Sequence, residues 1–88
     1  MNIWKYVLNK RDDIIEMPVG SKILSCGPQY DKVVVWVLVD EEVKLMEARH
    51  IVAYMTGEKF EIDRKHVFIG TCSFKNGSFI LHVFEKRG

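Results

Sequence analysis

The sequence predicts an all-β fold, a small antiparallel sheet, sandwich or partly open barrel formed by a single domain over residues 1–88. The first observation is the run Val33–Val39, in which five of the seven apolar residues are valine. Such a run is too short and too rich in β-branched residues for a helix, and is typical of a strand buried on both faces. The second observation is the pair Asn76-Gly77 between two apolar runs, the preferred sequence for a type I′ hairpin turn.

Composition is that of an ordinary globular protein, with 48% hydrophobic and 28% charged residues. The 13 basic and 12 acidic residues are well mixed and give a net charge of +1, so neither a nucleic acid polymer nor an anionic membrane is an expected partner. The first residues lack a signal-peptide pattern, and no apolar run approaches the length of a membrane span. We therefore expect a protein that is neither secreted nor inserted in a membrane.

The other strands follow from short apolar segments between polar, proline or glycine turns. Trp4, Tyr6 and Leu8 alternate along the first strand and give it one largely aromatic face. After a polar turn, a short second strand is expected antiparallel to the first, closed by Pro18 and Gly20. The expected strands cover residues 3–8, 14–17, 21–27, 33–39 and 47–56, a short edge strand at 60–62 and the two strands of the C-terminal hairpin.

The valine run needs cover on both faces, which a chain of 88 residues provides with difficulty. Charged residues fence the run on both sides, at Asp31-Lys32 and at Asp40–Glu42. Either a tightly wrapped chain or a second subunit can supply the missing layer. We favour the subunit, and so predict a homo-oligomer, a dimer or larger, with the central strand beneath the subunit interface.

Residues 40–57 admit two interpretations. Asp40 is a suitable cap for a helix that Gly57 would end, with apolar residues at helical spacing between them. Against a helix, Ile51–Thr56 is rich in residues that favour strands. We therefore predict a loop, a short helix or a single helical turn near 41–46, followed by a strand at 47–56.

The hairpin turn fixes a register. It places Phe74 opposite Phe79, Cys72 opposite Leu81 and Gly70 opposite Val83 on the core face. The other face is an apolar floor on which the Thr71 hydroxyl lies directly across from the His82 imidazole. That face is either a ligand surface or a subunit interface. It carries Ile69, Thr71, Ser73, Ile80, His82 and Phe84.

Neither of the two cysteines belongs to a zinc-binding pattern. Cys26 and Cys72 are expected to be reduced packing residues within strands, not a disulfide. No metal or cofactor is predicted.

Several short segments, in this order and spacing, resemble a family of small uncharacterised proteins common in tailed-phage genomes. The chain departs from the family pattern at Met55–Glu58, where Gly-Thr-Gly-His is usual. The resemblance implies an accessory phage protein acting in the cytoplasm of the infected host cell. It rests on Ile3–Tyr6, Met17–Leu24, Trp36–Asp40, Thr56-Gly57, Ile69–Thr71 and His82–Glu85.

The favoured function is a non-catalytic sponge that binds a small nucleotide-derived immune signal and withholds it from host effectors. This argument rests on likeness in size and assembly to phage proteins of that class. A phosphate needs cationic or backbone donors, and a base needs an aromatic face. The candidate ligand-binding residues are Arg49, His50, Tyr54, Thr56, Thr71 and His82. Each also has an ordinary structural interpretation, as surface charge, core or a satisfied sheet histidine.

Three alternatives are weighed against the sponge. A host-protein inhibitor or interaction module can use Trp4 and Tyr6 as anchors, although these residues also suit a strand packed on its own core. A minor virion component has no direct support in the sequence. An enzyme is not expected, because the three histidines are widely spaced and no serine or cysteine sits in a nucleophile context.

The hairpin turn gives a first test. Asn76→Pro fixes φ near −65° where the turn needs a positive value, so we expect a loss on the order of 3 kcal/mol in the free energy of unfolding. Thermal denaturation measures this loss, and wild-type stability in the variant would refute the turn.

Overall fold

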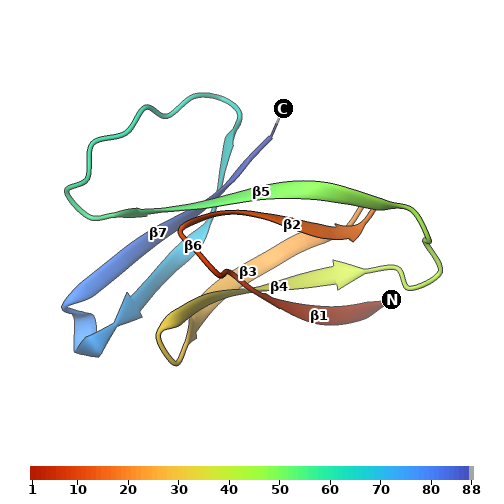
Figure 1. Cartoon of the computed structure of the whole chain (residues 1–88), viewed down its shortest axis with the longest axis horizontal. Helices are drawn as coiled ribbons and strands as arrows, with labels where there is room; N and C mark the ends of the chain where they lie inside the picture. Colours follow the sequence, from red (N-terminus) through yellow and green to blue (C-terminus); the bar gives the residue numbers. More distant parts are fainter. Residues whose placement is uncertain (88) are drawn as a thin grey trace.

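The computed structural model describes residues 1–87 and forms from them seven strands in two antiparallel sheets, which confirms the all-β class. The sheet orders are β1-β4-β3 and β2-β5-β7-β6. Figure 1 shows β2 and β5 lying over β1 and β4. The strands are β1 (Asn2–Val7), β2 (Asp12–Pro18), β3 (Lys22–Gln29), β4 (Lys32–Val39), β5 (Met46–Met55), β6 (His66–Phe74) and β7 (Phe79–Lys86), and a 3₁₀ turn, η1 (Lys75–Gly77), joins the last two.

The two sheets enclose one apolar core and meet along one side only. Val35 and Val37 of β4 pack in this core with Met17, Ile51 and Val83 of the other sheet, all of them fully buried. β3 packs beside β6 and closes one side of the sandwich. β1 and β2, on the opposite side, belong to different sheets and do not pair with each other. The fold is therefore a sandwich with one closed and one open side.

The second strand does not pair with the first, so that expectation was wrong. β1 pairs with β4, and the pairing ends at a bond from the Leu8 N–H to the Val33 carbonyl, 2.9 Å from N to O. Three residues later, the Arg11 carbonyl accepts a bond from the Ala53 N–H, so β2 starts beside β5 in the other sheet. The short connection between them turns a corner instead of forming a hairpin.

The core face of the valine run is buried, as predicted, whereas its outer face is only partly covered: Val34 is buried, and Trp36 and Leu38 are half-buried. Val34 points away from the core and is 0% exposed. The Trp36 indole lies over Gly27, where an added Cβ would come within 2.9 Å of the ring. The Lys5 side chain crosses β4 from β1 and donates to Gln29 on β3, 2.5 Å from Nζ to Oε1. The chain itself therefore supplies part of the cover that was expected from a second subunit, and the oligomer stays a prediction.

The segment between β4 and β5 is a loop with one turn and no helix. The Asp40 carboxylate accepts a bond from the Glu42 N–H, 3.0 Å, and its carbonyl accepts one from the Val43 N–H, 3.1 Å. The predicted strand follows as β5. The expected edge strand at 60–62 is absent, because these residues lie in the loop between β5 and β6.

The hairpin register is confirmed: Phe74 pairs with Phe79 and Cys72 with Leu81. Asn76 and Gly77 take the positive φ values of the expected turn, 55° and 89°, and Lys75 also lies at 50°. The Ser78 N–H closes the turn on the Lys75 carbonyl, 3.2 Å.

One residue of the predicted outer face is misplaced. A bulge between Phe68 and Gly70 shifts the register, so Phe68 and not Ile69 lies across from Phe84. Ile69 packs against the core instead. A bulge inserts one unpaired residue, which the hairpin turn alone does not indicate.

The closed side is a tight seam between two cysteines. Cys26 of β3 and Cys72 of β6 are both free thiols, with 3.6 Å between the sulfur atoms. Burial and the neighbouring Cys72 raise the pKa of Cys26 to about 12, so its thiol is a poor nucleophile. Gly70 leaves room for Cys26, since a Cβ there would lie 2.9 Å from Sγ.

This seam predicts a non-additive pair of substitutions. Gly70→Ala places a methyl group against Cys26 and should lower the free energy of unfolding by about 1–3 kcal/mol. In a Cys26→Ala background the sulfur is gone, so the same change should cost much less. Urea unfolding of the four variants of this cycle measures the difference, and strictly additive losses would contradict the seam.

Candidate functional site

A cationic notch forms where β7 ends before its neighbour. The ladder between β5 and β7 stops at the pair His50 and Lys86, whereas β5 continues back to Met46 with only β2 beside it. A cavity of about 580 Å³ lies beside β5, beyond the end of β7. We call it the cationic notch; its lining residues are Glu47, Ala48, Arg49, His50, Lys65, Glu85, Lys86 and Arg87.

A buried ion pair forms the floor of the notch. The Arg49 guanidinium binds both carboxylate oxygens of Glu85, through Nε and, at 3.0 Å, through Nη2. Its Nη1 donates to the Ser21 carbonyl at 2.8 Å and to Glu47 at 3.3 Å. Only 12% of the Arg49 side chain and 5% of the Glu85 side chain are exposed. Most of the donors of Arg49 are therefore used within the fold.

Arg49 and Glu85 shift each other's pKa in the direction that keeps both groups charged. Burial would raise the pKa of Glu85, but the bonds and charge of Arg49, helped by Arg87, lower it below its ordinary value. The Glu85 carboxylate raises the pKa of Arg49 in turn. Both groups are therefore ionised at neutral pH.

Two lysines in the notch lack an acidic partner in the described part of the chain. Lys65 and Lys86 form no side-chain ion pair there, while Arg87 lies 3.5 Å from Glu85. The Arg87 N–H donates to the Lys65 carbonyl at 2.8 Å, so the backbone brings these cations to one place. The lining of the notch therefore has an excess of positive charge, since Arg49, Lys65, Lys86 and Arg87 outnumber Glu47 and Glu85.

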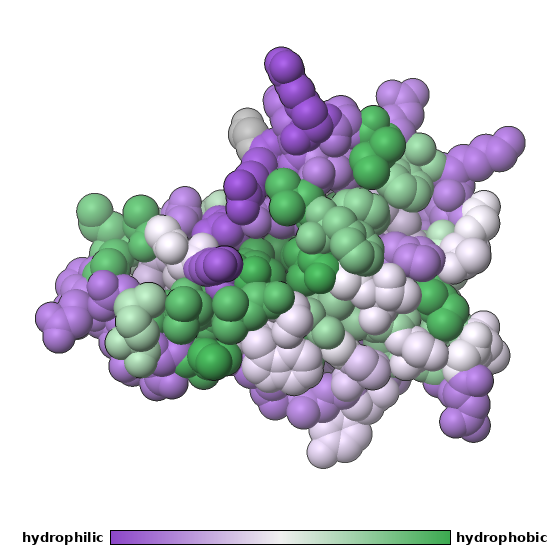
Figure 2. Space-filling model, turned by 180° about the vertical axis from the view of Figure 1, so that it is seen from behind, coloured by the Kyte–Doolittle hydropathy of each residue, from purple (hydrophilic) through white to green (hydrophobic). Residues whose placement is uncertain are grey.

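A second cavity of about 420 Å³ adjoins the notch and shares Glu85 and Arg87 with it. Its other lining is mainly apolar and comes from the starts of β3 and β6, including Leu24, Val67 and Phe68. Phe68 is 58% exposed. From behind, Figure 2 shows apolar surface across the middle of the molecule and hydrophilic side chains around it. The two cavities together form a groove with a cationic and an apolar part.

A hydroxyl and imidazole cluster lies further along the outer face of the same sheet. His82 pairs with Tyr54 of β5 on one side and with Thr71 of β6 on the other. Its Nε2 lies 2.7 Å from the Thr56 hydroxyl and its Nδ1 lies 3.3 Å from the Thr71 hydroxyl. Both ring nitrogens are thus engaged by threonines.

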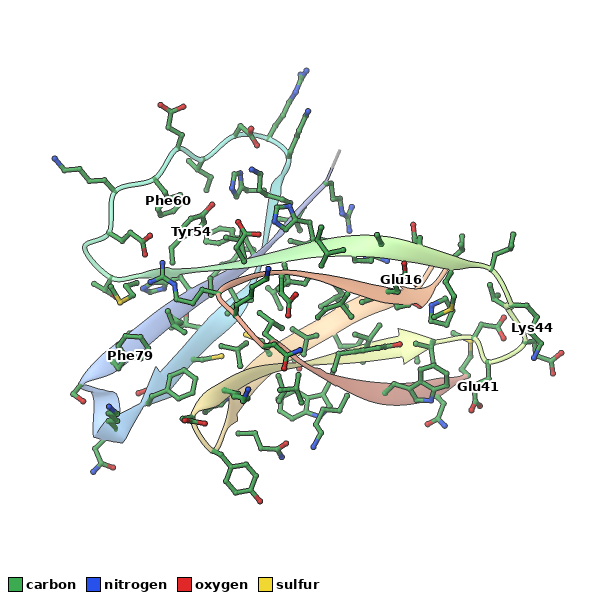
Figure 3. The ribbon with its side chains drawn as sticks, in the orientation of Figure 1. Glu16, Glu41, Lys44, Tyr54, Phe60 and Phe79 are labelled. Carbon is green, nitrogen blue, oxygen red and sulfur yellow. The ribbon has the colours of Figure 1, made fainter. Side chains whose placement is uncertain are left out.

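A second histidine anchors the long loop between β5 and β6. His66 Nδ1 bonds to Asp63 at 3.0 Å and Nε2 to the Tyr54 hydroxyl at 3.1 Å, with 2% of the side chain exposed. Figure 3 shows Phe60 reaching from the loop toward Tyr54, and the two rings stack with centroids 3.6 Å apart. Burial, and then the charges of nearby carboxylates, raise the pKa of Tyr54.

Comparison with known families identifies the chain at the family level. Its whole length, residues 1–88, matches the family described as Domain of unknown function (DUF7352). The chain belongs to this family. No curated protein and no solved structure matches it. The family description assigns no activity to a DUF7352 domain, so function has to be argued from the site.

The described residues of this DUF7352 domain include no helix long and apolar enough to cross a membrane. Among the same residues there is no group of three or more His, Cys, Asp or Glu side chains placed to hold a metal ion.

The six candidate residues fall into two separate groups. Arg49 and His50 line the cationic notch, where Arg49 serves the ion pair and His50 Nε2 binds Asp12. Tyr54, Thr56, Thr71 and His82 form the cluster further along the sheet and do not line the notch. The predicted pairing of Thr71 with His82 is confirmed.

Sequence reasoning missed the residues that give the notch its charge. Lys65, Lys86 and Arg87 lie in charged segments of the chain, typical of solvated surface. The basic pair Lys86-Arg87 at the end of the C-terminal strand, after Glu85, was the available signal. This pair could be assigned to a site only once the sheet order was known, because that order places the end of β7 beside β5.

The buried pair gives a prediction for stability. Arg49→Met leaves Glu85 buried with only its longer contact to Arg87 and should cost about 3–5 kcal/mol. Arg49→Met with Glu85→Leu removes both charges and should regain most of that loss. Urea unfolding near neutral pH measures both, and equal losses in the single and double variants would contradict this role.

The same pair predicts the pH dependence. Because the folded protein lowers the pKa of Glu85, the pair contributes its stability above the ordinary pKa of a glutamate. That contribution is lost as the pH falls below about 4. The double variant should lose less stability on acidification than the wild type does.

Proposed function

We propose that this domain is a non-catalytic binding protein for a small nucleotide-type anion, held in the groove formed by the cationic notch and its apolar neighbour. The observation that carries the proposal is the adjacency of the two cavities, which share Glu85 and Arg87. A nucleotide joins an anionic phosphate to a flat apolar base. The groove offers a matching pair of environments.

The phosphate would lie against Lys65 and Lys86. Both residues line the notch, and within the described part of the chain neither side chain forms an ion pair with a carboxylate, although the bond with His66 and the charge of Lys65 lower the pKa of Asp63. Bonds between charged donors and phosphate oxygens are about twice as strong as neutral ones. Arg49 has a supporting role here, because Glu85 and Ser21 already occupy its donors.

The base would lie against Phe68. Its ring is largely exposed at the apolar end of the groove and packs edge-on against Phe84 at 5.3 Å between centroids. Aromatic side chains stack on every base, at about 1–3 kcal/mol each. Such a surface supports binding of a class of nucleotides and does not select one base.

The surroundings of the histidines support binding over catalysis. His50 is bonded to Asp12, His66 to Asp63 and Tyr54, and His82 to two threonines. A general base needs a nucleophile within hydrogen-bond reach and space for a substrate. The His66 side chain, at 2% exposure, has no such space.

The biological setting proposed here is sequestration inside an infected bacterium. The resemblance to small tailed-phage proteins suggests that the ligand is a nucleotide-derived immune signal, which the protein withholds from host effectors. A sponge of this kind releases its ligand unchanged when it unfolds.

The test removes the two unpaired charges of the notch. Wild-type protein is incubated with cyclic oligonucleotides, ADP-ribose derivatives and ADP, filtered and heated, and the released ligand is identified. Lys65→Ala with Lys86→Ala should weaken binding at least about tenfold, since two charge-assisted bonds are lost. Phe68→Ala should weaken nucleotide binding but leave pyrophosphate binding unchanged.

The matched control is Lys10→Ala with Lys75→Ala, which removes the same charge at exposed positions that do not line the notch. Equal affinities in the two double variants would show that the notch is not the site. Chemically altered ligand after release would indicate an enzyme, and failure to bind any of these anions would refute the proposal.

A further inference from the structure

The edge of β1 away from β4 carries main-chain groups that no other strand formed by residues 1–87 meets. The bond from the Leu8 N–H to the Val33 carbonyl places Leu8 in a hydrogen-bonded pair. Hydrogen-bonded and non-bonded pairs alternate in an antiparallel ladder, so Tyr6 and Trp4 bond to β4 as well. The N–H and C=O groups of Ile3, Lys5 and Val7 therefore point outward. Of these groups, the Ile3 N–H is capped by the Asn2 side chain, at 2.8 Å.

The other edge strand of the open side, β2, carries more charge than β1. By the same alternation, the outward-facing main-chain groups of β2 belong to Asp12, Ile14 and Glu16. β2 carries three acidic residues and no basic one. Charged side chains on an edge are a common protection against pairing with another chain. β1 has a single charged residue, Lys5, within an otherwise uncharged strand.

The two faces of β1 differ in what they offer a neighbouring strand. Trp4 and Tyr6 point inward, half-buried against the core. Ile3, Lys5 and Val7 point to the outer face and are exposed. A strand added beside β1 would therefore extend the apolar core on one side and meet Lys5 on the other.

The outer face of this sheet is basic. The register places Lys5 beside Trp36, Lys22 beside Leu38 and Lys32 beside Gln29, all on the outer face. None of the strand positions that share this face holds an acidic residue. Lys5 is bonded to the neutral amide of Gln29, which leaves its charge uncompensated. The face thus favours a partner with acidic side chains on the same side.

We propose that the β1 edge is a docking site for an extended acidic segment of a partner protein, added as a fourth strand to the sheet β1-β4-β3. The partner strand alternates acidic residues, which face the lysines, with apolar residues, which pack beside Trp4 and Tyr6. Main-chain bonds to Lys5 and Val7 supply affinity, and the alternating side chains supply specificity. This surface is independent of the cationic notch.

The test uses synthetic peptides of alternating glutamate and valine, with alternating lysine and valine as the charge-reversed control. In the free protein the amides of Lys5 and Val7 should exchange with solvent rapidly, while those of Trp4 and Tyr6 exchange slowly. The acidic peptide should bind and slow the exchange of Lys5 and Val7. Equal binding of both peptides, or protection at another edge, would overturn the proposal.

Two variants locate the contact. Lys5→Glu should weaken binding of the acidic peptide at least about tenfold, because it places like charges side by side. Val7→Pro removes one outward N–H without touching the ladder to β4, and should also weaken binding. Ile14→Pro makes the matched change on β2 and should leave affinity unchanged; a loss equal to that of Val7→Pro would contradict the assignment.

A second copy of the chain is the competing occupant. Sedimentation of the protein without peptide measures it. A dimer that Val7→Pro dissociates would show that β1 pairs with itself, and would overturn the proposal of an acidic partner. A monomer that still binds the acidic peptide would support it.

Discussion

The buried ion pair between Arg49 and Glu85 is the constraint on which one end of this molecule depends. Arg49 belongs to the four-stranded sheet, yet its guanidinium also binds the Ser21 carbonyl, directly before the first residue of β3 in the other sheet. One side chain thus joins both layers where the apolar core ends. The cationic notch lies immediately outside this pair, so its shape depends on it.

The open side and the covered valine run share one cause, the small size of the chain. A domain of 88 residues cannot surround two sheets with further layers. The chain covers part of the outer face of β4 with the stem of Lys5, which stretches across the sheet, and the Trp36 indole of β4 lies over Gly27 of β3. The sheets close at the cysteine seam, and the edges of β1 and β2 stay free on the other side. The free edge of β1 is therefore a consequence of the short length of the chain.

Local sequence patterns predicted the positions of most strands. They did not predict which strands pair when those strands are far apart in the sequence. The register from Phe74 to Val83 followed from the turn alone, because the pleat fixes which residues face each other. The partner of β2 did not follow, since it depends on which strands pack together in the whole fold. Arg49 and Glu85 are 36 residues apart and were not linked by any sequence pattern. The bulge at Ile69 had no sequence signal either. Because of it, the exposed Phe68 lies on the outer face where Ile69 was expected.

Both proposed surfaces carry features that stability does not explain. The notch is lined by Lys65, Lys86 and Arg87, whereas its two acidic residues, Glu47 and Glu85, both bind Arg49. Like charges at close range cost free energy unless an anion offsets them. β1 leaves outward amides unpaired, although β2 shows that this sequence can protect an edge with acidic residues. Departures from local consistency concentrate at functional sites in natural proteins. An anion in the notch would offset the repulsion there, and an added strand would satisfy the edge of β1.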